Sequence, residues 1–464
     1  MSAALHRQTE LSEQLLLLYE LGYSDPYMHH ISGTFNFKSH PDLLDDSDLP
    51  LLDIIAVCLT SGRPGDVVAV AFDKCEGICL VLAKHGPVLP EDETATNAFF
   101  SQVKAASSWM DLLPFLFSHS KANIEKQLLR LSQMTIDLFS DLQLEIATYL
   151  DKSESMEDEF PKSKAWRRFL YEDRQLTIKC ILDDILHISR DESSAFNAQT
   201  NKASYTEYAR VFGAAYTLLH SRFLDMLTGV SNHNISLKLR AEKLKRRLGK
   251  VCQYSRLDKL IKQMKRFPDI PFRWLRDDLK GTGEGVFEIC GEPIEAIERV
   301  LNIKLSLEQI EKITQRFPRL LDDWAQYRSF KTCVHAELRI ILHFSSSLPS
   351  LSPGKLGAYQ ELPLGCSKRS CLCCTLWIEA FNETTKLLWT TSGSHGKSYS
   401  NWALPGNVQG VAAELDKYLM DATWTRLVDI LERVPRIPRR QEDIDDDRIV
   451  QAAFDRIKEL SGQL

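Results

Sequence analysis

The order of hydrophobic and polar residues along the chain predicts both strands and helices. Two short apolar runs, at 66–72 and 78–83, are separated by a loop that ends in Gly77, which is typical of a β-hairpin. Because both runs are almost continuously hydrophobic, we expect strands that are buried on both faces, as in an α/β sheet. From about residue 90 to 330, apolar residues recur every three or four positions, and this spacing predicts helices.

After residue 330 the pattern changes to an alternation of helix and strand. Helices are predicted at 334–344, from about 371 and at 408–433, and strands at 358–364 and 386–391. Such alternation favours a sheet covered by helices, so we predict an α/β fold with a large, mostly helical insertion or accessory domain. The predicted parts are N-terminal helices with the hairpin at 1–95, the helical accessory region at 96–330, the core at 331–434, and a charged tail with a terminal helix at 435–464.

Composition narrows the class of protein. The 464 residues are 44% hydrophobic and 26% charged, which is average for globular proteins and excludes wholesale disorder. The formal net charge of −6 excludes a chain that is basic throughout, although it allows a local basic face. No apolar stretch approaches the roughly 18 residues of a membrane helix, and the first segment has the pattern of an amphipathic helix rather than an export signal. We therefore expect an intracellular protein, cytoplasmic or nuclear, without a membrane partner.

The cysteines and one histidine mark the place to look for chemistry. Five of the eleven cysteines lie between residues 333 and 374, and in a reducing compartment such a cluster more often indicates metal binding or catalysis than disulfides. His335, Cys371 and Cys374 fit the three protein ligands of a catalytic zinc site, whose fourth position is left for water. Cysteines three residues apart at a helix start share one face, where the helix dipole favours thiolates. Glu337 is suited to move a proton rather than to bind the metal.

These motifs resemble the zinc-dependent cytidine-deaminase-like superfamily, whose signature is H-x-E followed by P-C-x-x-C. More narrowly, Gly365-Cys-Ser-Lys-Arg-Ser-Cys-Leu-Cys-Cys374 and Gly393-Ser-His-Gly-Lys-Ser-Tyr-Ser-Asn-Trp-Ala-Leu-Pro405 resemble two stretches of the fungal deaminase-like family. The resemblance covers about 331–406 and extends more loosely to the hairpin at 66–84. It departs from the superfamily at Ser370, where proline usually shapes the start of the helix.

The resemblance implies a hydrolytic deaminase that acts on a nucleobase, with zinc as its cofactor and Glu337 as its catalytic residue. Cytosine is favoured over adenine by the general habit of the family. The loop after residue 391 is then expected near the active site, where His395 and Trp402 are candidate substrate-binding residues. A structural turn explains His395 equally well, and core packing is the commoner role of an aromatic residue such as Trp402.

Two other interpretations fit the same residues. Cys366 or Cys373 would complete a closed site with four protein ligands, which is typical of a structural zinc module in a helical scaffold. Alternatively, the chain keeps the deaminase fold and binds a partner without turnover.

A basic tract between Lys238 and Arg276 is the second candidate site. It holds fourteen Lys or Arg residues and has apolar residues at helical spacing. A basic helix face of this kind can follow the phosphate backbone of single-stranded DNA or RNA, and neutralised phosphates would make binding dependent on salt. The candidate nucleic-acid-binding residues are Lys243, Lys245, Arg246, Arg247 and Lys250. A solvated helix face is the commoner explanation of such a run, and the sequence leaves the form of the substrate and the oligomeric state open.

Overall fold

The computed structural model describes residues 3–23, 48–63, 65–74, 77–150, 159–160, 178–190, 202–229, 235–267, 270–276, 281–327, 329–347, 361–385, 387–406 and 412–432. The chain divides into two compact units. The first combines Met1–Val57, Gly65–Glu93 and Asp269–Leu464, and the second combines Cys58–Pro64 and Thr94–Pro268. The charged tail and terminal helix predicted at 435–464 lie outside the described residues.

The first unit contains a four-stranded sheet in the order β3-β2-β1-β7. Strands β1 (Val68–Asp73) and β2 (Cys79–Lys84) pair antiparallel, which confirms the predicted hairpin. At the edges, β3 (Phe272–Trp274) runs parallel to β2, and β7 (Gly365–Cys366) runs antiparallel to β1. The central residues of β1 and β2 are buried, as their continuous apolar runs predict.

Two further pairs of strands belong to this unit. Strand β4 (Gly285–Glu288) pairs antiparallel with β5 (Ser329–Thr332), and β6 (Glu361–Pro363) pairs parallel with β8 (Leu388–Thr390). Strands β6 and β8 fall within segments that the sequence predicts to be strands. By contrast, the helical pattern up to residue 330 gave no indication of β3 or β4, because strands of three or four residues are too short to establish a twofold alternation.

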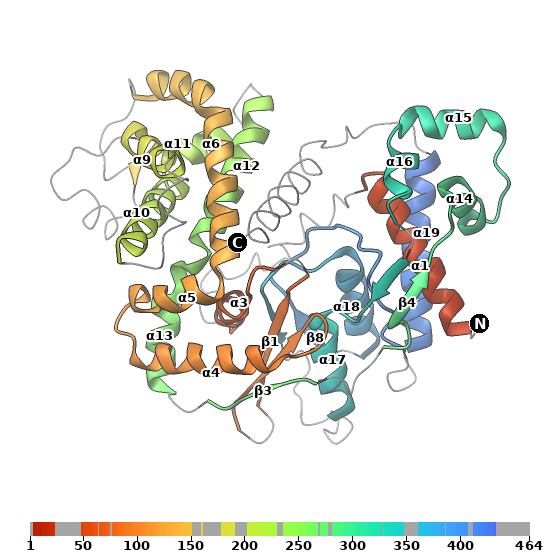
Figure 1. Cartoon of the computed structure of the whole chain (residues 1–464), viewed down its shortest axis with the longest axis horizontal. Coiled ribbons are helices and arrows are strands. Elements are labelled where there is room, and N and C mark those ends of the chain that lie inside the picture. The colour runs from red at the N-terminus through yellow and green to blue at the C-terminus, as the bar shows by residue number, and fades with distance from the viewer. Residues whose placement is uncertain are drawn as a thin grey trace, which may run out of the picture. The chain divides into compact units, whose positions relative to one another are not determined.

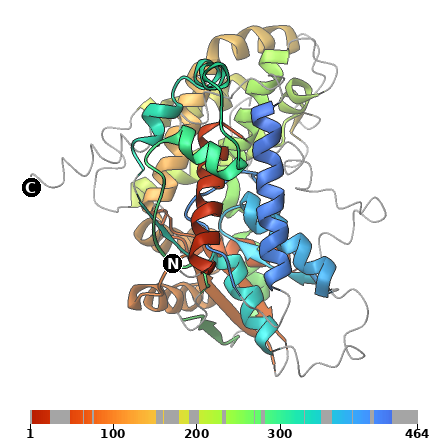
Figure 2. The ribbon, with the colours of Figure 1, turned by 90° about the vertical axis from the view of Figure 1, so that its right-hand side faces the viewer.

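Helices complete the first unit, and one apolar core joins α1, the strands β1 and β2, and the helices α17, α18 and α19. Helix α17 packs against β1 and β2, and α1 packs along α19, as Figures 1 and 2 both show. The sheet therefore has helical cover, and the fold is α/β. The described helices are α1 (Ala3–Glu20), α3 (Leu49–Cys58), α14 (Pro293–Leu301), α15 (Leu307–Arg316), α16 (Leu320–Trp324), α17 (Ala336–Ser347), α18 (Leu372–Thr385) and α19 (Ala412–Glu432).

The described elements of the second unit are helices, in keeping with the periodicity of that part of the sequence. Helices α6, α9, α10, α11 and α12 share one apolar core, and Figure 1 shows α6 and α12 side by side. The elements are α4 (Pro90–Ala105), which begins in the first unit, the 3-10 helices η2 (Trp109–Leu112) and η3 (Cys252–Arg256), and α5 (Leu113–His119), α6 (Lys121–Leu150), α9 (Ile178–Arg190), α10 (Lys202–Leu219), α11 (Arg222–Thr228), α12 (Ile235–Val251) and α13 (Leu257–Arg266). Nowhere in the described parts of either unit does a helix combine the length and apolar character needed to cross a bilayer.

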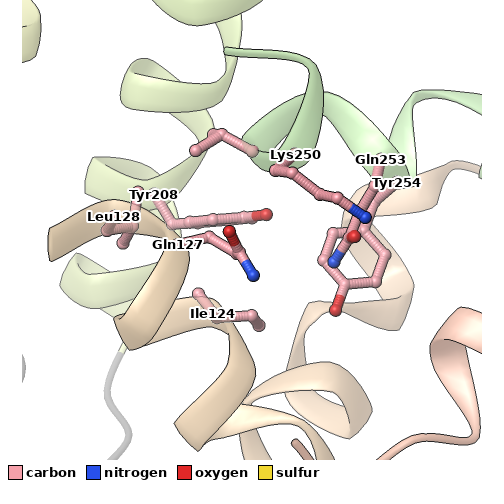
Figure 3. Close-up of a pocket in the computed structure, with 8 residues that line it drawn as sticks. Ile124, Gln127, Leu128, Tyr208, Lys250, Gln253 and Tyr254 are labelled. Atoms are coloured by element: carbon pink, nitrogen blue, oxygen red, sulfur yellow. The ribbon is translucent and has the colours of Figure 1, made fainter. Parts of the chain in front are cut away.

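A shallow, open hollow, here called the pocket, lies among these helices. Figure 3 shows Tyr208 from α10 and Tyr254 from η3 on its walls, with Gln127 of α6 between them. Lys250 of the basic tract also lines it, but the His and Cys motifs contribute no residue to it. The pocket is therefore a feature of helix packing in the second unit and is not part of the candidate metal site.

Gly365 marks the closest approach of α3 to the sheet. A β-carbon at this position would lie 2.2 Å from the carbonyl carbon of Leu52 and 2.5 Å from the nitrogen of Asp53, and these backbone atoms move only if α3 shifts. We expect Gly365→Ala to lower the free energy of unfolding by about 2–3 kcal/mol, the usual cost of overpacking. Urea denaturation measures this loss.

Gly291→Ala is the matched control, because a β-carbon there meets nothing within 4 Å. We expect it to change the free energy of unfolding by less than about 0.5 kcal/mol. Equal losses in the two variants would show that the contact between α3 and β7 is not what restricts position 365 to glycine.

Candidate metal centre

The start of α17 and the start of α18 bring three possible metal ligands together. His335 directly precedes α17, Cys371 directly precedes α18, and Cys374 lies in the first turn of α18. Both helices bury apolar residues in the core of the first unit, so the packing of each helix fixes the position of its first turn. The three side chains therefore converge although more than thirty residues separate the two motifs.

The donor atoms of these three residues, here called the metal centre, are close to one another. Nδ1 of His335 lies 3.6 Å from Sγ of Cys371 and 3.3 Å from Sγ of Cys374. All the donor atoms lie within 4.8 Å of one another, and all three residues are buried. This group of side chains can hold a metal ion, and it consists of the same three residues that the sequence motifs indicate.

The two sulfur atoms accept hydrogen bonds that favour thiolates. The indole Nε1 of Trp402 donates to Sγ of Cys374, and the backbone N–H of Cys374 donates to Sγ of Cys371, both over 3.4 Å. Burial nevertheless raises the pKa of the Cys374 thiol well above its usual value, and the adjacent Cys371 sulfur raises it further. A cation in the metal centre would reverse this balance, because a coordinated thiol loses its proton.

Glu337 lies in the first turn of α17, next to the metal centre. Its side chain is 3% exposed, and burial raises the pKa of its carboxyl group to about 7, against the opposing charge of Lys368. A carboxyl group with a pKa near neutrality can accept a proton and release it again. Oε2 of Glu337 and Nε2 of His335 are buried and have no hydrogen-bond partner in the described part of the chain, so polar atoms remain for a ligand.

The loop after β8 folds against the start of α18. The backbone N–H of Leu372 donates to the carbonyl of Lys397, and that of His395 donates to the carbonyl of Ser370. The half-buried ring of His395 meets Tyr399 edge-on with 5.6 Å between ring centroids, and the Tyr399 ring lies 6.4 Å from that of His335. Tyr399 is 38% exposed, so the loop places a ring that reaches the surface 6.4 Å from the buried ring of His335.

Trp402 is fully buried beside the metal centre. Gln8 of α1 holds its loop, since Nε2 of Gln8 donates to the carbonyl of Trp402 over 2.9 Å and Oε1 accepts from the N–H of Leu404 over 2.8 Å. The structure thus gives Trp402 a contact with the candidate ligand Cys374. Its expected contact with a substrate stays a prediction, as does that of His395.

His85, which directly follows β2, also lies beside the metal centre, although no motif in the sequence indicates it. Its ring centroid lies 4.6 Å from that of His335, and its Nε2 contacts Sγ of Cys333. Burial, together with the charges of Lys368 and Arg339, lowers the pKa of His85 to about 4, so the imidazole is neutral at pH 7. Nothing in the sequence near His85 indicates this position, because only the pairing of β2 with β1 and the packing of α17 on them bring it there.

A buried ion pair holds the segment that leads into α17. Oε1 of Glu284 accepts from the backbone N–H of Val334 over 2.9 Å and from the guanidinium of Arg339 over 3.0 Å. Nε of Arg339 donates in turn to the carbonyl of Val334. These contacts orient the residue next to His335, and Glu284 lies too far along the chain for any motif to have indicated it.

The two further cysteines that the sequence left as possible ligands do not join the metal centre. Neither Cys366 nor Cys373 belongs to the described group whose donor atoms converge. The Cys366 thiol lies 3.7 Å from the carbonyl of Leu364. Burial raises the pKa of the Cys373 thiol well above its usual value, and the charge of Arg426 on α19 acts against this rise. The described geometry therefore corresponds to three protein ligands rather than four.

The candidate nucleic-acid-binding residues all lie on α12, in the second unit, whereas the metal centre belongs to the first. The apolar side of α12 is buried, and Nζ of Lys245 forms an ion pair with Asp225 over 2.7 Å. These residues therefore lie on the part of α12 that is not buried in the core of the second unit.

Comparison with known proteins bears on one segment of the chain. A family model described as an OTT_1508-like deaminase matches residues 334–406. This segment resembles a deaminase family. It contains the metal centre, Glu337 and the loop through Trp402, while the helical second unit lies outside the match. The chain matches no curated protein and no solved structure.

Two cysteines at the start of α18, Cys371 and Cys373, allow a direct test of the ligand set. We expect Cys371→Ser to lose bound metal, because the serine hydroxyl is a poor substitute for a thiolate, and Cys373→Ser to retain it. Metal content per chain, measured by plasma mass spectrometry after dialysis, distinguishes the two. Loss of metal from Cys373→Ser would make that residue a ligand and contradict the geometry.

The hydrogen bond from Trp402 to Cys374 is expected to strengthen metal binding. Removing a hydrogen bond that orients a metal ligand typically weakens affinity by 10-fold or more, so we expect Trp402→Phe to weaken Co²⁺ binding by about 10-fold. Titration of the thiolate-to-cobalt absorption band against a chelator measures the affinity.

Trp377→Phe is the matched control for this substitution. Trp377 is also buried and lies on α18, but its indole N–H has no hydrogen-bond partner in the described structure. We expect its replacement to leave Co²⁺ affinity unchanged. An equal loss of affinity in both variants would assign the effect to packing and not to the N–H···S hydrogen bond.

Proposed function

We propose that this protein is a zinc-dependent hydrolytic deaminase that acts on a nucleobase. One observation carries the proposal: His335, Cys371 and Cys374 converge beside the buried carboxyl group of Glu337, within a segment that matches a deaminase family model. The histidine and cysteines alone would suit many metal proteins. The carboxyl group beside them is what a hydrolytic reaction needs in addition.

The donor set and its spacing support zinc as the metal. Zinc bonds of about 2.3 Å to sulfur and 2.05 Å to nitrogen separate the two donor types by about 3.6 Å in a tetrahedral site. The corresponding distances from Nδ1 of His335 are 3.3 and 3.6 Å. One imidazole and two thiolates are too soft a set for magnesium or calcium. Three protein ligands also leave the fourth position that catalytic zinc sites reserve for water.

Glu337 carries the proton transfers of the proposed reaction. Bound zinc supplies activation of a water molecule as a nucleophile at neutral pH. Glu337 would accept a proton from that water and deliver it to the departing amine, and its buried carboxyl group beside the metal centre is placed for both steps. In the overall reaction water adds its oxygen to the ring carbon, the carbon–nitrogen bond breaks, and the base leaves with a carbonyl group while ammonia is released.

The surroundings of the metal centre support a planar, aromatic substrate. The exposed ring of Tyr399 and the half-buried ring of His395 lie close to His335, and rings in such positions can stack on a base. We assign both residues to substrate binding. Cytosine is favoured over adenine on the sequence resemblance alone.

The finer fold assignment is a cytidine-deaminase-like domain interrupted by the helical unit. Two features support it. Helix α17, which begins directly after His335 and contains Glu337, packs on the β1–β2 hairpin, and α18 follows with the two cysteines at its start. Most of the second unit, Thr94–Pro268, then enters the chain between the hairpin and α17, as an insertion.

Mass spectrometry on a mixed pool of nucleosides, single-stranded DNA and RNA tests the reaction. Replacing an amine by a carbonyl adds about 1 Da to the target base. We expect this gain with the wild-type protein, and a rate about 10²–10⁴-fold lower with Glu337→Gln, because proton transfer typically contributes a factor of this size. The variant is expected to keep its zinc, since Glu337 is not a ligand.

Glu383→Gln, on the exposed side of α18, is the control and should be as active as the wild type. A wild-type protein that holds zinc and deaminates nothing in the pool would favour the alternative of a binding protein without turnover. Loss of zinc from Glu337→Gln would show that the glutamate is misassigned.

A further inference from the structure

Positive charge is concentrated in one short part of the second unit. That unit contains 28 Lys or Arg residues and 20 Asp or Glu residues. Residues 235–267 alone account for 12 of the basic residues and only two of the acidic ones. The remainder of the unit is slightly acidic, and the whole chain has a net charge of −6. The excess of positive charge therefore belongs to α12, η3 and α13, here called the basic helices.

Packing directs these charges away from the interior. Helix α12 buries an apolar stripe in the core of the second unit, and its candidate residues Lys243, Arg246, Arg247 and Lys250 follow a spacing of three and four, which places them together on another side of the helix. Helix α13 repeats the arrangement, with Lys259, Lys262 and Arg266 on the side opposite its apolar stripe. The stripes are Leu237, Ala241, Leu244, Leu248 and Val251 on α12, and Leu257, Leu260, Ile261 and Met264 on α13.

Acidic groups within the unit do not balance this charge. Arg240 pairs with Asp141, and Lys245 pairs with Asp225. Asp258, one of the two acidic residues of the basic helices, accepts the backbone N–H of Trp109 over 2.8 Å. Other basic side chains also make contacts within the protein, but basic residues still outnumber acidic ones on these helices by six to one. The charge along these helices is therefore predominantly positive, and a surface of this kind attracts a polyanion.

The packing also indicates which polyanion fits. A helix that lies on an anionic membrane inserts its apolar face into the lipid. Here the apolar stripe of α12 is already buried in the core of the second unit, and the exposed Ile235 and Leu239 are too few to form a second such face. Rows of basic side chains along a rigid helix suit a chain of regularly spaced phosphates.

We propose that the basic helices α12 and α13 bind the phosphate backbone of single-stranded nucleic acid. The preference for a single strand rests on the proposed function, because a base must be unpaired before it can be deaminated. The contact with phosphates does not depend on the base, so binding is expected to be tolerant of sequence and strongly weakened by salt.

Fluorescence anisotropy of labelled single-stranded DNA and RNA with the full chain tests the proposal. The test variant combines Arg246→Glu, Lys250→Glu and Lys262→Glu, which lie on the exposed sides of α12 and α13. We expect this variant to bind at least about 10-fold more weakly. Its affinity should also fall less steeply between about 50 and 200 mM salt, because each lost phosphate contact reduces the logarithmic slope by about 0.7.

The matched control reverses three exposed charges elsewhere in the same unit, with Lys104→Glu, Lys121→Glu and Arg210→Glu. We expect it to bind like the wild type, and circular dichroism should show both variants folded. Equal weakening in the two variants would overturn the proposal, because net charge and not the basic helices would then govern binding. Absence of binding by the wild type at low salt would also overturn it, as would binding to phosphatidylserine vesicles but not to oligonucleotides.

Separate readouts distinguish this proposal from the proposed function. If the wild type deaminates a free nucleoside, the test variant should do so at the same rate, since its substitutions lie outside the deaminase segment. If no deamination occurs but oligonucleotide binding still depends on the basic helices, the docking surface stands and the deaminase assignment fails. Equal affinity for a duplex and a single strand would overturn the preference for single strands.

Discussion

Burial of an imidazole and two thiols side by side is the constraint on which the first unit depends. Each group is polar or ionisable, and burial alone disfavours both the thiolates and the imidazolium. Holding them together requires two helices whose positions are fixed by a large apolar core, so that the first turns of α17 and α18 cannot separate. A divalent cation with a preference for nitrogen and sulfur would convert this unfavourable grouping into a binding site.

Hydrogen bonds from distant segments fix the backbone around that site. Gln8 of α1 fixes the loop that carries Trp402, and Glu284 with Arg339 fixes the residue before His335. Asp53 of α3 accepts the N–H of Cys366 over 2.9 Å and the hydroxyl of Ser392, which joins β7 to the loop after β8. The candidate ligands come from one segment of 40 residues, but the groups that orient them come from most of the first unit.

The metal centre and the excess of positive charge lie in different units. The deaminase segment lies in the first unit, and the basic helices lie in the second. Such a division suits a protein in which one part performs a reaction on a base while the other part binds the backbone to which the base is attached. On the proposal that the basic helices bind a polyanion, a chain of net negative charge can do so because the charge that matters is local.

The sequence by itself determined the hairpin, the helical character of the second unit and the identity of the three metal-centre residues. Each of these follows from local periodicity or from spacing within a short motif, which the chain carries however it folds. Tertiary structure decided that Cys366 and Cys373 stay outside the metal centre, that Trp402 donates to a candidate ligand, and that His85 lies beside His335. These outcomes depend on the direction of side chains and on contacts between segments that are separate in the sequence, and no local pattern records them because packing alone sets them.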